Sequence, residues 1–431
     1  MHNAFTLQSF CDKITAATLD ASSFIKESKN YAADLFKKGS KSGTRATLYF
    51  NGMGDIETSD DIEGNDDSGH AAMSISSMSG DVKQYSVPLV LGNAKGKFTW
   101  TNVEERFKMG TVDEDCVKPT ADALAERIVK KVINNAYLRS TGVVVAAKDA
   151  GTGTSASFLP LAAALASLRK MRKGMTLVGH LDSDTMGVLS SLPVTAGVGH
   201  FDQPSEKLAE LYGEAAIGTF HRCPFIDEPF MPVITTGAAP GASCLVNGEV
   251  DQDDVTDGAD TMDIAIDGIA SGVTTIKAGS AFTIANVSRC TGSGTPLVNT
   301  PYVFVVQKDA EVTSNAATLK VLPVYFNAGL GYIPTVSVDK IADNAAITWL
   351  TGANKTYAVG IVRSREALNW TPVEMNDIKG CENAKTTVPT MSFHAAYDGD
   401  IDDASNKGRL DAIFNGKIVD PRFVRTIYWE L

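Results

Sequence analysis

A long helical stripe of apolar residues is the clearest pattern in the chain. Six apolar side chains form two adjacent rows at i+4 spacing: Leu124, Ile128 and Val132, with Val129, Ile133 and Tyr137 beside them. Pro119 suits the first turn of a helix, and Gly142 suits the position after the last turn. The pattern predicts one helix of about 22 residues and about 33 Å, because each helical residue adds about 1.5 Å.

The segments before this helix carry the residue types and the alternation of strands. RATLYFNG, DVKQYSVPLVLG and KGKFTWTNV are rich in β-branched and aromatic residues, and a polar, glycine-rich stretch separates the first two. We interpret residues 45–116 as an extended β-loop whose acidic tip contains Asp60 and Asp61. Such a two-stranded arm has little core of its own, so another part of the molecule must hold it.

The first 44 residues carry a shorter apolar stripe, from Leu7 to Phe24, followed by a lysine-rich stretch. This pattern predicts an amphipathic helix. Two interpretations are open: residues 1–44 are an arm that binds a partner, or they pack on their own domain.

The chain changes character twice after the long helix, which occupies residues 117–142. Residues 143–236 mix buried-strand candidates with helical patterns, which predicts a central α/β region. Residues 237–323 hold short strands separated by Gly and Asp turns, a pattern typical of a small β-barrel. Because residues 324–431 return to mixed structure and end in another strand pattern, we interpret the barrel as an insertion. The fold class predicted is α+β.

The composition narrows the classes of function. The formal net charge is −12, and 44% of the residues are hydrophobic. An acidic chain does not gather phosphate backbones by counterion release, which disfavours sequence-specific binding of nucleic acid. No apolar run approaches the roughly 20 residues that cross a bilayer, so no membrane partner is expected. The N-terminus lacks a secretory-signal pattern, and we expect synthesis in a cytoplasm.

Metal sites and disulfides are not expected. Six cysteines are scattered along the chain without a C-x-x-C pair or a nearby histidine at ligand spacing, which predicts reduced and mostly buried thiols. The stretch DGDIDDASNKGR imitates a calcium loop, but Asp403 stands at the sixth position instead of Gly and Arg409 at the twelfth instead of Glu. We assign neither metal nor other cofactor.

A glycine turn after VVVAA offers an enzymatic alternative. Gly151, Gly153 and Ala156 follow the G-x-G-x-x-A spacing of dinucleotide-binding turns, and Asp182 would then contact a ribose. However, Lys148-Asp149-Ala150 separates the strand from the first glycine, and the downstream sequence becomes β-rich instead of repeating βα units. The simpler interpretation is a loop that caps the following helix.

Catalytic motifs are otherwise missing from the sequence. The six histidines are isolated, and neither G-x-S-x-G nor H-E-x-x-H occurs. His180, with Asp182 and Asp184 after it, is more simply a strand-end histidine followed by turn aspartates. The sequence therefore favours a protein that is not an enzyme, with a nucleotide-dependent enzyme as the alternative.

The order of parts resembles a known family. ADALAERIVKKVINNAYLRSTG takes the place of a spine helix, and DAGTGTSASFLPLAAALASLRK looks like the turn into the first helix of a central domain. FHRCPFIDEPFMPVITTGA and GVTTIKAGSAFTIANV are similar to the segment before an insertion and to a strand pair inside it. In this order the chain resembles the major capsid proteins of tailed phages, the Hong Kong 97 fold. The inserted barrel resembles coat proteins of short-tailed, scaffold-dependent phages typified by Salmonella phage P twenty-two.

This resemblance implies a fold and a set of partners. The fold would have an N-terminal arm, an extended loop, a long spine helix in a peripheral domain, a central (axial) mixed α/β domain and an inserted small β-barrel. Residues 324–431 would return through the axial domain to peripheral strands. The partners would be copies of the chain in pentamers and hexamers, a scaffolding protein, a portal protein and double-stranded DNA held without sequence readout. The protein would be assembled in the host bacterial cytoplasm and reside in the virion.

Acidic loops are the candidate subunit contacts. The resemblance implies that the loop from residue 251 to 260 is a hairpin protruding from the barrel toward a neighbouring subunit. Asp251, Asp253 and Asp254 would meet cations there, or else they are solvated turn residues. Asp60 and Asp61 in the extended loop are candidates of the same kind.

Overall fold

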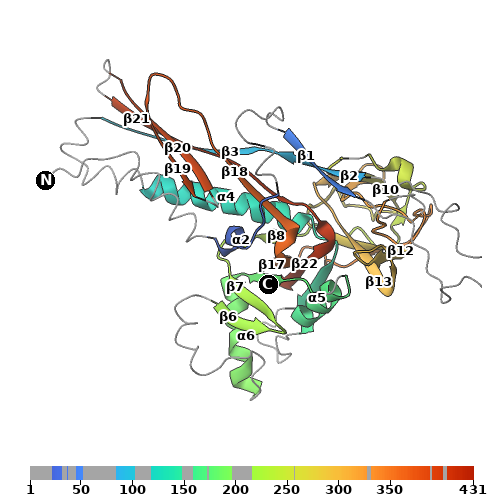
Figure 1. Cartoon of the computed structure of the whole chain (residues 1–431). Coiled ribbons are helices and arrows are strands. Elements are labelled where there is room, and N and C mark those ends of the chain that lie inside the picture. Colours follow the sequence, from blue (N-terminus) through green and yellow to red (C-terminus); the bar gives the residue numbers. More distant parts are fainter. Residues whose placement is uncertain are drawn as a thin grey trace, which may run out of the picture.

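The computed structural model describes residues 22–31, 36, 45–51, 84–101, 118–147, 159–171, 174–196, 216–256, 258–327, 332–388, 391–400 and 405–431. Most of the regular structure in these ranges is strand (Figure 1). None of the helices in these ranges is long and apolar enough to cross a membrane.

A five-stranded antiparallel sheet with one long helix along it forms the outer part of the molecule (Figure 1). The strands are β18 (Leu368–Val373), β21 (Ser405–Ile418), β20 (Met391–Asp400), β19 (Glu382–Val388) and β3 (Gly92–Thr101). The helix is α4, Lys118–Leu138, so a helix lies where the apolar stripe predicts one. Along β3 the residues alternate between intermediate and exposed, as expected of a sheet with one covered face.

A seven-stranded mixed sheet forms the centre. Its strands are β4 (Val143–Ala147), β22 (Val424–Glu430), β17 (Thr356–Ser364), β5 (Leu177–Leu181), β7 (Cys223–Asp227) and β6 (Ala216–Phe220), with β8 (Val233–Thr235) paired to β17. The pairs β4–β22 and β5–β7 are parallel, and the others are antiparallel. The sheet therefore joins the end of the chain to strands from its middle.

The two faces of the central sheet belong to different cores. On β17, Tyr357, Val359 and Ile361 pack in a core with α4, whereas Ala358 and Val362 face a second core. Helix α5 (Leu159–Arg169) contributes Leu161, Leu165 and Leu168 to that second core, and α6 (Ser183–Ala196) contributes Met186 and Leu189. The alternation along β17 is the period-2 pattern of a strand buried on both sides.

Residues 244–349 surround a separate apolar core, called here the β-unit. Its strands are β9 (Leu245–Val246), β10 (Met262–Asp267), β11 (Thr275–Ile276), β12 (Ala281–Cys290), β13 (Pro296–Val305), β14 (Ala310–Glu311), β15 (Ala317–Val321) and β16 (Ile347–Trp349). They pair as three small sheets, β15-β10-β9, β11-β14 and β13-β12-β16.

Two features of the β-unit differ from the barrel that the sequence predicts at 237–323. The pairing gives three short sheets instead of one continuous closed sheet, because the β12–β13 register shifts after Thr283 and again after Ser288, with Asn286 at a positive φ of 65°. The packing also extends beyond residue 323, since Phe326, Val336 and Ile347 belong to the same core. The turn-rich pattern identifies the strands but not their pairing partners.

A two-stranded ribbon connects the outer sheet to the β-unit. Strands β1 (Arg45–Asn51) and β2 (Gln84–Val90) pair antiparallel, as the sequence predicts for the extended loop. One side of the ribbon packs in a small core with Phe36 and Val419 through Ala46, Val87 and Leu89. Asp60 and Asp61 lie outside the described residues. The ribbon is therefore held by other parts of the chain.

The described cysteines are free. Cys223, Cys244 and Cys290 are buried, and Cys381 is partly exposed. Cys11 and Cys116 lie outside the described residues, so the prediction of reduced, mostly buried thiols holds for the four cysteines that the structure describes.

Candidate functional site

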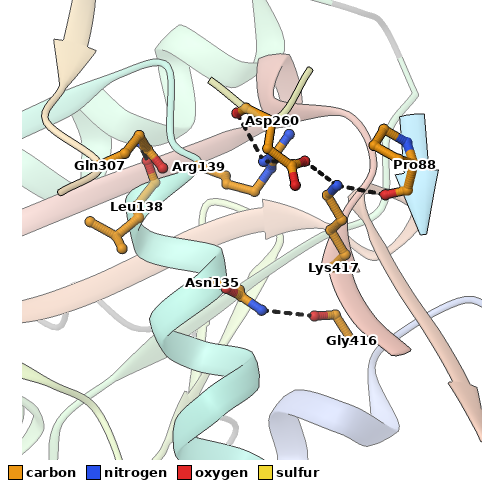
Figure 2. A network of polar contacts seen from close by, with 8 residues as sticks. All are labelled: Pro88, Asn135, Leu138, Arg139, Asp260, Gln307, Gly416 and Lys417. Carbon is orange, nitrogen blue, oxygen red and sulfur yellow. Dashed lines mark hydrogen bonds and ion pairs between the residues drawn. The ribbon is translucent and has the colours of Figure 1, made fainter. Parts of the chain in front are cut away.

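The C-terminal end of α4 is the point where the helix, the ribbon, the outer sheet and the β-unit meet (Figure 2). We call this place the junction and define it by Pro88, Arg139, Asp260, Gln307 and Lys417. These residues come from β2, the turn after α4, the β9–β10 loop, the segment after β13, and β21. The junction is thus built from five separate stretches of sequence and holds them in one place.

One carboxylate at the junction faces two cations. Asp260 forms ion pairs with Arg139, at 3.5 Å from Nη1 to Oδ1, and with Lys417 Nζ. The side chains of Arg139 and Lys417 are only 13% and 12% exposed, whereas that of Asp260 is 56% exposed. Asp260 therefore partly neutralises a pair of nearly buried cations from its more exposed position.

Lys417 also holds the ribbon. Its Nζ donates a hydrogen bond of 2.6 Å to the carbonyl oxygen of Pro88, and the Asn415 amide donates one of 2.8 Å to that of Val90. These two carbonyls lie on β2 and are hydrogen-bonded by side chains of β21. Because proline cannot donate within a sheet, β2 suits an edge position. The ribbon is attached to the outer sheet by side chains instead of a backbone ladder.

The last turn of α4 is linked to the β-unit. The carbonyls of a final helical turn lack partners within the helix. Gln307 supplies one, because its Nε2 donates a hydrogen bond of 2.5 Å to the carbonyl oxygen of Leu138. Asn135 donates to the carbonyl oxygen of Gly416 at 3.4 Å, which joins the helix to β21 as well (Figure 2).

Burial and like charge both act on the cations of the junction. Burial lowers the pKa of Lys417, and the neighbouring Arg139 lowers it further, while Asp260 opposes both effects. Burial also lowers the pKa of Arg139, and Asp260 again opposes the shift. The carboxylate of Asp260 is therefore what makes a charged lysine and a charged arginine tolerable side by side.

A hollow of about 630 Å³, counted with the solvent at its open side, lies next to the junction. Its wall includes Pro88 from the ribbon, Arg139 from the helix end, Tyr302 from the β-unit and Arg422 from the segment before β22. The lining combines apolar groups with the cations Arg139 and Arg422 and the carboxylate of Asp420.

A second polar cluster fixes the N-terminal segment on the central sheet. The helix α2 (Ser23–Lys26) lies over β5 and β17, where Arg363 donates 2.7 Å hydrogen bonds to the carbonyls of Phe24 and Glu27. The Arg363 guanidinium also lies over the Phe24 ring, 4.4 Å from its centroid. Residues 22–31 thus pack on their own chain, one of the two possibilities that the sequence leaves open for the N-terminus.

Glu228 is the buried carboxyl of this cluster. Its Oε2 accepts from the backbone N–H of Phe24 at 3.4 Å and from the hydroxyls of Ser22 and Ser23 at 3.5 and 3.4 Å. Burial raises the pKa of Glu228 to about 7, against these hydrogen bonds, which lower it. His180, also fully buried, stays neutral because burial holds its pKa well below the usual value.

The acidic turn predicted as a subunit contact is exposed. Gln252–Asp254 form a 3₁₀ turn in which Asp251 Oδ1 accepts from the N–H of Asp253 and Asp254 Oδ2 accepts from the N–H of Asp251, at 2.8 and 3.0 Å. In the part of the chain that the structure describes, no cluster of His, Cys, Asp and Glu is arranged to hold a metal. Two of the three carboxylates therefore stabilise the turn itself.

The second half of this loop differs from the protruding hairpin that the resemblance implies. Asp260 returns to the helix end and β21, and Gly258 passes so close to the ribbon that a Cβ there would lie 2.8 Å from Ser86 Oγ. Gly258 also has a φ of 73°, which favours glycine. The 251–254 turn carries the exposed Asp253 and Asp254, while the 258–260 end is part of the junction.

The residues of the enzymatic alternative are not assembled into a site within the described ranges. Gly151, Gly153 and Ala156 lie outside those ranges. Asp182 accepts from the N–H of Thr185 at 3.1 Å and so caps the start of α6. His180 is buried against Phe24 of α2, so it and Asp182 have structural contacts instead of forming an open catalytic cluster with Asp184.

Sequence reasoning missed the junction. Arg139, Asp260 and Lys417 are single charged residues in three distant segments, and none belongs to a motif. One local signal exists, since Arg139 lies in the last turn of the predicted helix, where cations complement the helix dipole. That signal locates the helix end but not its partners.

Comparisons with known proteins find similarity in structure only. No protein family matches the chain, and no curated protein matches it. Solved structures that resemble it include one of Mycobacterium phage Che8 (11% identity, 93% of this chain and 89% of that chain, TM-score 0.43). Others are the capsid of Ralstonia phage GP4 (8%, 94% and 86%, 0.43) and the capsid structure of the Cyanophage P-SCSP1u (10%, 90% and 84%, 0.43). At this level of identity and overlap we transfer no residue roles.

The substitution Asp260→Asn is expected to lower the free energy of unfolding by about 1–3 kcal/mol, because it leaves two nearly buried cations without a counter-charge. Urea unfolding measures the change. Asp263→Asn is the matched control, since Asp263 is 54% exposed and pairs with the exposed Lys320. Equal effects of the two substitutions would contradict the proposed role of Asp260.

The substitution Glu228→Gln is expected to change the pH dependence of stability. The folded chain keeps Glu228 protonated up to about pH 7, whereas the carboxyl ionises near 4.5 without these surroundings. The raised pKa contributes stability below pH 4.5 that is lost as the pH rises through 7. Glutamine stays neutral, so the variant gains about 3 kcal/mol relative to the wild type between pH 4.5 and 8.

Unfolding in urea at a series of pH values measures this gain. Glu366→Gln is the control, because the Glu366 side chain is 60% exposed and pairs with Lys29 of the same N-terminal segment. Parallel pH profiles for wild type and Glu228→Gln would mean that Glu228 ionises normally in the folded chain.

Proposed function

We propose that this chain is a major capsid protein that self-assembles into the icosahedral shell around the double-stranded DNA of a tailed phage. The observation that carries the proposal is the order of its parts. An N-terminal segment, a two-stranded ribbon, one long helix, a central sheet with two helices, a separate β-unit and returning strands follow one another along the chain. This order supports the one that the sequence resemblance implies, and we propose that the β-unit is an insertion of the Salmonella phage P twenty-two type.

The layout suits a molecule whose neighbours complete its contacts. The ribbon has only two strands, and such pairs are marginally stable alone. Its small core covers one side, while Tyr49 and Val90 remain 66% and 48% exposed. On the β-unit, Val298 is 84% exposed. These exposed apolar side chains are available for contacts between copies.

The charge of the chain fits a container for DNA. With a net charge of −12, a shell wall holds few phosphates tightly, so the genome can leave it. The partners we propose are copies of the chain in pentamers and hexamers, a scaffolding protein, a portal protein and DNA bound without sequence readout. Assembly takes place in the host bacterial cytoplasm, and the product is located in the virion.

The acidic turn at residues 251–254 is the contact we propose on the β-unit. Its three aspartates lie on one short turn, where Asp253 and Asp254 are exposed and Asp251 is partly buried, and cationic groups of a neighbouring copy would neutralise them. Asp60 and Asp61 are proposed as a second contact on sequence grounds alone.

Negative-stain electron microscopy of the purified protein tests the proposed function. A capsid protein is expected to form uniform hollow particles or rings of capsomers. Dispersed monomers that bind a nucleotide saturably would contradict the proposal and favour the enzymatic alternative.

The variant Asp251→Asn/Asp253→Asn/Asp254→Asn tests the acidic turn. Asparagine keeps the side-chain oxygens that accept the turn's hydrogen bonds and removes the charge, so the fold is expected to persist while the yield of closed particles falls several-fold. Asp339→Asn, at another exposed position of the β-unit, is the control. An unchanged yield of closed particles would show that these carboxylates make no subunit contact.

A further inference from the structure

Two buried arginines meet where the β-unit joins the central sheet. Arg289 is on β12 and 8% exposed, and Arg425 is on β22 and 1% exposed. Among the described residues, no carboxylate forms an ion pair with either guanidinium, and three of their buried nitrogen atoms have no hydrogen-bond partner: Nε and Nη1 of Arg289 and Nη2 of Arg425. Buried charges are normally paired, so this arrangement needs an explanation.

The two guanidinium groups converge on one point of the backbone. A Cβ at Gly142 would lie 2.8 Å from Nη1 of Arg289 and 2.8 Å from Nε of Arg425. Glycine at this position therefore gives both side chains room to approach each other. Like charges this close in a buried setting repel strongly.

Nearby groups satisfy only part of Arg425 and leave the charge unbalanced. Its Nε donates to the Ser167 hydroxyl at 2.6 Å, and its Nη1 donates to the Thr141 hydroxyl at 3.0 Å and the Arg422 carbonyl at 2.9 Å. Asp420, the nearby carboxylate, accepts from both Nε and Nη2 of Arg422. Every one of these hydrogen-bond partners of Arg425 is neutral, and Asp420 acts on its charge only from a distance, without forming an ion pair with it.

Loss of a proton does not relieve the repulsion. Burial lowers the pKa of Arg289 to about 10. Burial together with Arg289 lowers the pKa of Arg425, while Tyr302 and Asp420 oppose this shift, and a guanidinium keeps its proton in proteins. A guanidinium with a pKa of about 10 is still charged at neutral pH. The phenol of Tyr302 lies near both arginines, but burial raises its pKa, so it stays neutral as well. Among the described residues, therefore, neither arginine has an ion-pair partner, and a small anion from solution would supply one.

The hollow beside the junction is lined by neighbours of this pair, although neither arginine is part of its wall. Its wall includes Thr141, which bonds Arg425, and Tyr302, which interacts electrostatically with both arginines. The burial of the guanidinium nitrogens excludes a bulky side chain from another molecule. A small ion with several acceptor oxygens suits the three unpartnered donors best, because guanidinium groups bind oxyanions through parallel N–H bonds.

We propose that Arg289 and Arg425 form a binding site for a small tetrahedral oxyanion of the inorganic phosphate class, which enters through the hollow lined by Thr141 and Tyr302. The bound ion bridges the β-unit to the central sheet, since each unit supplies one of the arginines. The site consequently couples the attachment of the β-unit to the anion concentration. This inference does not depend on the proposed capsid function.

Equilibrium dialysis of the full-length protein against radiolabelled inorganic phosphate tests the site directly. We expect saturable binding of about one phosphate per chain, and Arg289→Met is expected to weaken it at least about tenfold, as loss of charge-assisted hydrogen bonds does. Arg127→Met is the matched control, because Arg127 is an exposed arginine on α4. The control is expected to bind like the wild type.

Thermal unfolding in phosphate and in chloride at equal ionic strength provides the second measurement. Phosphate is expected to raise the midpoint of the wild type saturably, more than chloride does, and to leave that of Arg289→Met unchanged. Equal effects of the two salts, or no saturable phosphate binding by the wild type, would overturn the proposal. The wild-type measurements decide the matter even if Arg289→Met fails to fold.

Discussion

The burial of α4 on several sides is the constraint on which the rest of the structure depends. Its apolar rows share one core with Phe393 and Leu410 of the outer sheet, Val359 of the central sheet and Val303 of the β-unit. Because all these elements pack on the same helix, α4 fixes the relative positions of sheets that do not pair with one another through the backbone. Hydrophobic burial supplies the free energy that stabilises this arrangement. The hydrogen bonds and ion pairs of the junction fix how the parts are oriented at the helix end.

The buried cations near the end of α4 oppose the stability of this arrangement. Burial at the helix end and beside it encloses Arg139, Lys417, Arg289 and Arg425, while Asp260 is the carboxylate that faces the first two. The chain is acidic overall, yet cations are in surplus where its parts meet. The stability of that region therefore depends on counter-ions. In a protein proposed to form a shell, the sensitive point lies where the β-unit is attached to the rest of the subunit.

Local sequence patterns predicted the helices and strands well, but they could not predict which distant segments pair or pack together. The stripe at residues 119–142 and the leucines of α5 follow from helical periodicity, and both faces match the buried positions. The pairing of β3 with β21 joins residues over 300 positions apart, which no local period encodes. The same holds for Asp260, whose partners are set by the way distant segments pack. The turn-rich β-unit could be located, but bulges decide how its strands pair.

Native-state hydrogen exchange of the full-length protein tests most directly whether α4 unites the molecule. If its burial holds the parts together, the amides of α4, β21 and β22 exchange with the same, highest free energy of opening, as one cooperative unit. Exchange of the α4 amides at a clearly lower free energy than those of either sheet would contradict this account, because the sheets would then persist without the helix.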